Sequence, residues 1–187
     1  MALFAQAQIY DGITQPTTYR FAIPATISTE DGSSSIAPFI GYKCEPTEWL
    51  SVTPIVQYNT ANNALIPQVW LNFDVNNTVY LLSRSIYDGG TGKYRHGMAT
   101  TIKLPAGFMI DATWDNFING SEFAHGDRLQ AVAGYAHSWI VFNMGYSMRS
   151  HPGFIANVRF KITELSWVQL KYDGGLKAVS LTSLFHI

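Results

Sequence analysis

Apolar and polar residues alternate along several segments of the chain. Between residues 93 and 104, Tyr94, Met98 and Ile102 fall on one face of an extended segment, and mostly small or charged residues fall on the other. The segments 139–149 and 153–163 repeat this pattern. A period of two residues is typical of a β-strand whose faces meet different environments. The sequence has no useful stretch of helical periodicity, so the pattern predicts an all-β protein.

Connections between the expected strands alternate in length. Glu45–Thr47, Asn76–Asn77 and Pro105–Ala106 are very short, whereas Thr60–Leu65 and residues 116–127 are longer and richer in Gly, Asn, Ser and Asp. Asn-Asn suits a type I′ hairpin, because asparagine tolerates a positive φ. Tight turns at one end and wider loops at the other predict an up-and-down antiparallel sheet whose termini lie at the same end. We expect about twelve strands in a single domain of residues 18–187, near residues 18–28, 35–44, 48–59, 66–75, 78–87, 92–104, 107–115, 128–137, 139–149, 153–163, 165–172 and 176–187.

The composition limits the environments in which such a sheet can be stable. Charged residues make up 13% of the chain, against roughly 25% in soluble domains. No run approaches the ~18 consecutive apolar residues of a transmembrane helix, and a formal net charge of −1 argues against nucleic acid as a partner. Two alternatives remain. One is a membrane barrel whose lipid-facing residues recur at every second position; the other is a soluble, secreted or virion β-sandwich or jelly roll, such as a capsid or filament subunit.

Two segments resemble known membrane proteins. Residues 42–51, Tyr-Lys-Cys-Glu-Pro-Thr-Glu-Trp-Leu-Ser, form a strand–turn–strand pattern with a proline-containing polar turn. Residues 163–172, followed by Asp-Gly-Gly and a terminal strand, form a closing hairpin. Both are similar to segments of porin-like β-barrels of bacterial outer membranes. The resemblance implies a transmembrane β-barrel in a Gram-negative outer membrane, a channel for small solutes, the lipid bilayer as a partner, and oligomers as an option.

Aromatic residues cluster at both ends of the expected strands. Five lie beside the short turns: Tyr42, Trp49, Tyr135, Trp139 and Trp167. Six lie near the wider loops: Tyr58, Tyr87, Tyr94, Trp114, Phe154 and Tyr172. Two such bands are typical of the two membrane interfaces, because amphipathic rings prefer the headgroup level. The placement of these rings therefore favours lipid outside the sheet.

The polar faces of the strands provide the candidate site. In a barrel these faces point inward, which predicts a narrow lumen where basic groups outnumber acidic ones. Fixed charge and pore diameter set selectivity in such channels, so this lumen favours small solutes, anionic ones included. The alternative is structural, with Arg–Asp pairs that fill and cross-link a small barrel without conducting. The predicted pore-lining residues are Arg84, Lys93, Arg95, Lys103, Asp111, Asp115, Arg128, Arg149, Arg159 and Lys161.

No motif predicts catalysis. The sequence contains no Gly-x-Ser-x-Gly segment, no His-x-x-x-His pair and no Cys-x-x-Cys pair. We therefore expect no enzymatic activity, no metal site and no cofactor. The alternative is an outer-membrane lipid hydrolase or protease that uses Ser–His or Asp–His groups at the rim, with His96 and His125 as the candidates.

Residues 1–17 and three prolines fit the barrel less directly. Ala-Gln-Ala at residues 5–7 has the small-x-small form of a signal-peptide cleavage site, so residues 1–17 are expected to be a signal remnant, an extra strand or a plug.

Pro24, Pro38 and Pro54 fall inside expected strands, although proline cannot donate to a sheet ladder. In a closed barrel, each of them is expected to need a bulge or a strand end.

Overall fold

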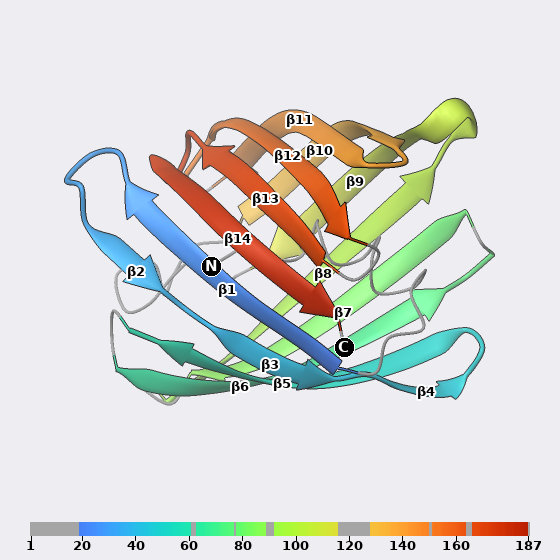
Figure 1. Cartoon of the computed structure of the whole chain (residues 1–187), viewed down its shortest axis with the longest axis horizontal. Helices are drawn as coiled ribbons and strands as arrows, with labels where there is room; N and C mark the ends of the chain where they lie inside the picture. Colours follow the sequence, from blue (N-terminus) through green and yellow to red (C-terminus); the bar gives the residue numbers. More distant parts are fainter. Residues whose placement is uncertain are drawn as a thin grey trace.

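The computed structural model describes residues 19–60, 63–76, 78–88, 92–115, 128–149, 151–163 and 166–186. These residues are almost entirely strands, curved into a barrel, with one 3-10 turn, η1 (Pro105–Gly107) (Figure 1). Among them, no helix has the length and apolar character needed to cross a membrane. The strands are β1 (Tyr19–Ser28), β2 (Ser34–Ile36), β3 (Phe39–Tyr42), β4 (Cys44–Thr47), β5 (Leu50–Asn59), β6 (Ala64–Asp74), β7 (Val79–Asp88), β8 (Lys93–Lys103), β9 (Phe108–Asp115), β10 (Arg128–His137), β11 (Ile140–Arg149), β12 (Gly153–Thr163), β13 (Ser166–Asp173) and β14 (Ala178–His186).

The strands form one closed antiparallel sheet. Strands that follow one another along the chain lie side by side, and β14 pairs with β1 through nine residue pairs, from Arg20 with His186 to Ser28 with Ala178. β2, β3 and β4 are successive pieces of one strand between β1 and β5, which makes twelve strands in the described part of the chain. The predicted twelve-stranded up-and-down barrel is confirmed. The alternative of a sandwich is wrong, because a single sheet closes on itself.

Prolines accompany the breaks in the second strand. Pro38 lies in the gap between β2 and β3. Pro24 lies inside β1, where pairing with β3 stops at Ala22 and pairing with β2 starts at Ala25. Pro54 lies inside β5, between the residues that pair with β3 and those that pair with β4. The expectation of a bulge or strand end is correct for Pro38 and wrong for the other two, because a missing N–H is tolerated beside an interrupted neighbour.

Two turns differ in detail from the sequence expectation. Residues 45–47 belong to β4, and the chain reverses at Glu48 and Trp49. The pairing of β4 with β5 shifts register between Cys44 and Thr47, so Pro46 lies at an irregularity rather than in the turn. The expected turn at residues 105–106 is one residue longer, because it forms η1 together with Gly107, and Ala106 has a φ of 60°.

Alternate residues of each strand face inward and outward, as the periodicity predicts. In β11, Phe142 and Met144 are 41% and 46% exposed, whereas Asn143 between them is 1% exposed. In β12, Phe160 is exposed and Arg159 is buried. Large apolar side chains thus cover the outer wall, and many polar ones face the interior. This is the arrangement of a barrel that is surrounded by hydrocarbon.

Ten of the eleven aromatic residues predicted at the interfaces are exposed on the outer wall. Beside the short turns, Trp49 stacks on Phe73 and Trp139 stacks on Phe160. The prediction for Trp167 is wrong, because this residue has the inward parity of β13 and is buried. The Arg159 guanidinium lies 5.3 Å from the centre of its ring.

Candidate functional site in the barrel interior

Half of the predicted pore-lining residues are buried inside the barrel. The structure places them on the inward faces of β7, β8, β9, β10 and β12, and none is more than 6% exposed: Arg84, Arg95, Asp111, Arg128 and Arg159. Asp111 accepts a hydrogen bond from Thr101 Oγ1 at 2.6 Å and interacts electrostatically with Arg159, three strands away. The wall therefore brings these charged groups together around one interior.

The other predicted residues lie nearer the barrel ends. Lys103 is half-buried, and its Nζ donates to Tyr80 Oη at 2.8 Å and lies 4.3 Å from the centre of that ring. Lys161 on β12 is half-buried. Arg149 is exposed at the end of β11, where its φ is 64°. Two side chains lie outside the described part of the structure: Lys93 and Asp115.

Three buried charged residues are absent from the sequence predictions: Lys43, Lys171 and Asp173. Lys171 has the inward parity of β13, so the alternation that identifies Arg159 also identifies it. Asp173 is the last residue of β13, although the following Gly-Gly is typical of a loop. Lys43 lies in the break between β3 and β4, but it has the same inward parity as Phe39 within the expected strand 35–44, and it forms an ion pair with exposed Glu45.

Arg128 and Asp173 form a fully buried ion pair near the wider loops. Arg128 Nη2 lies 2.5 Å from Asp173 Oδ1, and both side chains are 0% exposed. Arg128 Nε also donates to Ser147 Oγ at 2.5 Å. Asp173 Oδ1 accepts the backbone N–H of Leu176 at 3.1 Å, and Asp173 Oδ2 lies 3.8 Å from Lys171 Nζ. The cluster therefore joins β10, β11 and β13 to the turn that follows β13.

The buried charges are mostly positive. Among the described side chains, the buried cations are Lys43, Arg84, Arg95, Arg128, Arg159 and Lys171, and the buried carboxylates are Asp111 and Asp173. Six cations against two carboxylates leave a formal charge of +4 in this part of the interior, although the whole chain carries −1. Acidic residues such as Glu30 and Glu48 are exposed. The folded chain thus concentrates positive charge inside the barrel.

Side-chain amides are a second feature of the interior. Gln68 Nε2 donates to Gln57 Oε1 at 2.5 Å, and Trp70 Nε1 donates to Gln68 Oε1 at 3.0 Å. Asn143 and Asn157 are register partners on β11 and β12 and are at most 2% exposed. Neither of these two amides has a hydrogen-bond partner among the residues that the structure describes. Burying such a group is costly unless water or a solute satisfies it.

An apolar cluster narrows the interior, mostly in the half nearer the short turns. The rings of Phe39 and Trp70 lie 5.9 Å apart although their strands, β3 and β6, are not neighbours. The cluster contains residues from ten of the described strands, which extend around most of the wall: Ala22, Phe39, Ile55, Trp70, Tyr80, Leu82, Ala99, Met109, Val141, Trp167 and Leu184. Apolar constrictions of this kind limit the passage of water and ions through channels.

The residues considered for catalysis do not assemble in the interior. His96 lies on the outer face of β8, and its Nδ1 is 3.0 Å from Ser85 Oγ on β7. His125 lies outside the described residues. Within the described ranges, no group of three or more His, Cys, Asp or Glu side chains is arranged to hold a metal ion. The Ser85–His96 pair is therefore separate from the charged interior.

No family model and no curated protein matches the sequence, but solved structures match the fold. The KdgM porin aligns with a TM-score of 0.61 and 9% identity over 90% of this chain and 99% of that chain. An outer membrane channel from Pseudomonas putida F1 aligns with a TM-score of 0.62 and 11% identity, over 93% and 97% of the two chains. The NanC porin aligns with a TM-score of 0.54 and 10% identity, over 89% and 100%.

These three proteins are porins and channels rather than enzymes, which agrees with the expectation that this chain is not an enzyme. At sequence identities of 9–11%, these alignments show a similar fold and no more detailed similarity. The closed antiparallel barrel, its polar interior and these alignments confirm the resemblance stated from the sequence. The chain has the fold of a porin-like outer-membrane β-barrel.

Proposed function

We propose that this protein is a narrow channel for small anionic solutes in a Gram-negative outer membrane. The excess of buried cations over buried carboxylates carries the proposal. Positive charge inside a low-dielectric wall raises the local concentration of anions and repels cations. The exposed apolar side chains of the outer wall and the porin-like fold support the membrane location. One structure of KdgM is a complex with oligogalacturonate, an acidic saccharide, which supports this class of solute.

Two features of the interior define how such a solute passes. Arg128, Arg159 and Lys171 are at most 1% exposed, so a solute moves past them only when side chains are displaced. The amides of Asn143 and Asn157 offer donors and acceptors to a polar solute at that point. We therefore expect a small unitary conductance, further limited by the apolar cluster around Trp70.

The competing explanation is that the buried charges only stabilise the wall. In that case the Arg128–Asp173 pair cross-links strands and the barrel conducts nothing. Planar-bilayer recordings of the refolded chain separate the two explanations. We expect small steps and, under a KCl gradient, a reversal potential that moves toward the chloride equilibrium potential. The absence of steps from a folded, inserted sample overturns the channel, and a preference for cations overturns the anionic solute.

A charge-neutralising variant connects selectivity to the interior. Arg159→Gln combined with Lys171→Gln removes two buried cations, and we expect it to lower the chloride preference. Lys177→Gln is the matched control, because it removes one cation that is 57% exposed in the turn after β13. The control is expected to leave the reversal potential unchanged. Equal shifts in both variants would show that selectivity does not arise from the buried charges.

A further inference from the structure

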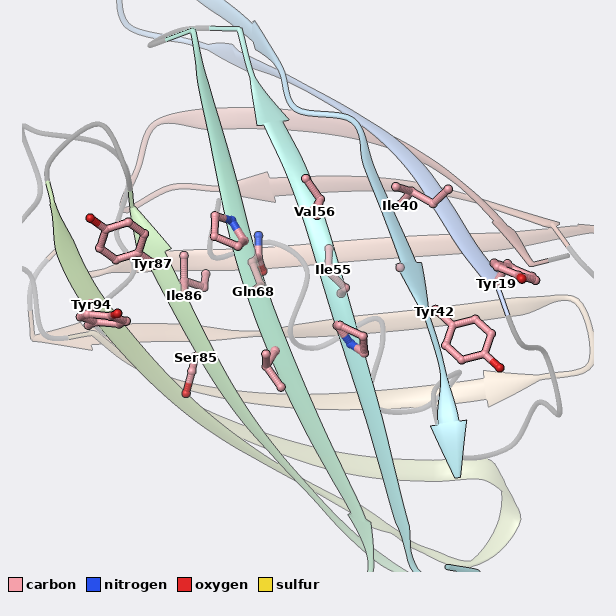
Figure 2. A pocket seen from close by; sticks show the side chains of 14 residues that line it. Tyr19, Ile40, Tyr42, Ile55, Val56, Gln68, Ser85, Ile86, Tyr87 and Tyr94 are labelled. Carbon is pink, nitrogen blue, oxygen red and sulfur yellow. The ribbon is translucent and has the colours of Figure 1, made fainter. Parts of the chain in front are cut away.

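The outer wall is hollowed over β1, β3, β5, β6, β7 and β8. The hollow has a volume of about 550 Å³ and an almost entirely apolar lining. Outward-facing Ile40, Val56 and Val69 line it together with Pro54 and Pro67. Figure 2 shows Ile40 and Val56 on strands that run side by side. The hollow therefore lies on the outside of the barrel, away from the charged interior.

The local sequence explains why the wall is concave here. Pro54 and Val69 are register partners, and so are Val56 and Pro67, so compact side chains stand opposite one another on β5 and β6. On other strands the outer wall carries larger side chains, such as Phe142 on β11. β3, which lies next to β5, is only four residues long. A patch of short side chains beside longer ones leaves a depression in the wall. The bilayer must fill this depression, because apolar atoms that line an empty space lose dispersion contacts.

Two tyrosine pairs bound the hollow. The rings of Tyr19 and Tyr42 are 5.1 Å apart, and those of Tyr87 and Tyr94 are 4.9 Å apart. Figure 2 shows the two pairs at opposite sides of the hollow. Tyr42 belongs to the short-turn end of the barrel, whereas Tyr87 and Tyr94 lie beside the connection between β7 and β8. The hollow therefore runs obliquely between the levels of the two membrane interfaces.

A polar pair lies at the second of these ends. Ser85 lines the hollow, and its Oγ is 3.0 Å from His96 Nδ1. Both residues face outward, one outward position inside the Tyr87–Tyr94 pair. Ser85 is three residues from the end of β7, and a strand tilted by about 40° rises roughly 2.5 Å per residue along the barrel axis. The pair thus lies near the boundary between headgroups and acyl chains, where polar side chains on the outer wall require polar contacts.

We propose that the hollow binds one lipid of the surrounding bilayer whose acyl chains are joined by ester bonds to a phosphate-bearing headgroup. An acyl chain follows the apolar lining, and the ester or phosphate oxygens of the same molecule accept a hydrogen bond from the Ser85–His96 pair, whose mutual hydrogen bond uses one of its two donors. A second barrel fits the site less well, because two convex walls meet along a narrow line and leave a hollow unfilled. The site is independent of conduction, since the outward side chains that hold the lipid do not face the interior.

Native mass spectrometry of the refolded full chain, released from bicelles of palmitoyl-oleoyl-phosphatidylethanolamine, tests the proposal. We expect one phospholipid to stay bound after activation has removed the others. Val56→Trp fills the hollow and is expected to lower the lipid-bound fraction at least several-fold. Leu181→Trp is the matched control, because Leu181 on β14 is 50% exposed and Val56 is 48% exposed. This control is expected to retain the lipid.

A second pair of variants tests the polar end. Ser85→Ala combined with His96→Phe keeps the shape of the wall but removes both polar groups, and we expect weaker lipid retention. Val69→Phe replaces Val56→Trp if the latter fails to fold, as judged by the heat-dependent gel shift. Equal retention in the hollow-filling and control variants overturns the proposal, and so does a change of oligomeric mass in Val56→Trp, which would assign the hollow to a second copy. Val56→Trp is expected to keep the wild-type conductance, so this outcome is separable from failure of the channel proposal.

Discussion

The buried Arg128–Asp173 pair makes Asp173→Ala a severe change. The substitution leaves the Arg128 guanidinium inside the barrel without its carboxylate, and it removes the acceptor of the Leu176 N–H. Removing one partner of a buried ion pair costs about 3–5 kcal/mol, because the remaining charge is left in a medium of low dielectric constant. The equilibrium constant of unfolding is therefore expected to rise by roughly two to three and a half powers of ten.

The chain contains a matched control for this prediction. Lys177 and Glu30 form an ion pair of nearly the same length, 2.6 Å, but their side chains are 57% and 66% exposed. An exposed pair contributes only about 0–1 kcal/mol, because solvent screens both charges. Glu30→Ala is therefore expected to leave the stability close to that of the wild type.

Urea unfolding of the refolded chain in lipid vesicles, followed by tryptophan fluorescence, measures both effects. The heat-dependent gel shift reports the folded fraction of each sample before the titration. Arg128→Met combined with Asp173→Leu is expected to recover part of the stability lost in Asp173→Ala, since the Arg128 charge is no longer buried without its carboxylate, whereas Lys171 stays buried. Equal stabilities of Asp173→Ala and Glu30→Ala would refute the reasoning, and so would a double variant that is no more stable than the single one.

Three further predictions address the outer wall, the constriction and an external loop. Met144→Arg, in the middle of β11, is expected to cost about 2–4 kcal/mol in a bilayer, whereas Leu65→Arg, at the loop end of β6, costs about 0–1 kcal/mol; equal costs in urea titrations would contradict the assigned depths. Trp70→Ala is expected to raise the unitary conductance, because it removes a large side chain from the apolar cluster, and an unchanged step size would place the constriction elsewhere. The pKa of Asp31 is lowered from 3.8 to about 2, chiefly by a hydrogen bond with the Ser28 side chain. This carboxylate therefore stabilises its loop above pH 3.8 and loses the contribution as the pH falls through 2, and Ser28→Ala is expected to raise the pKa measured by NMR titration.

Side-chain alternation predicts which residues face the interior, because parity alone decides the face of a strand. It identifies Arg159 and Phe160 correctly, and the same rule applied to β13 places Trp167 inside. Residue type alone predicts an interfacial position for Trp167, whereas its parity is that of Lys171, and both residues are buried. The sequence does not predict the turn at Glu48, because a proline such as Pro46 marks either a turn or an irregular strand, and only the register with the neighbouring strand distinguishes them.

The sequence does not predict which residues contact each other across the interior. Arg128 and Asp173 are 45 residues apart and lie on strands that are not neighbours. The tilt and shear of the closed barrel decide which inward residues of β10 and β13 contact each other. The register offset between these two strands is the sum of the offsets of the hairpins that lie between them. The apolar cluster has the same origin, because Phe39 and Trp70 lie on strands that are not neighbours and meet only where the wall curves around the interior.

The seam between β1 and β14 also constrains how the barrel is made. Arg20 pairs with His186, so this contact joins residues 166 positions apart along the chain (186 − 20). Bringing such distant segments together costs loop entropy before any pair of the seam contributes, which slows folding. Until then β1 and β14 each carry a row of unsatisfied amides and carbonyls that hydrocarbon cannot solvate. The time that β1 and β14 need to pair therefore determines how long an incompletely folded barrel can exchange strands with another chain.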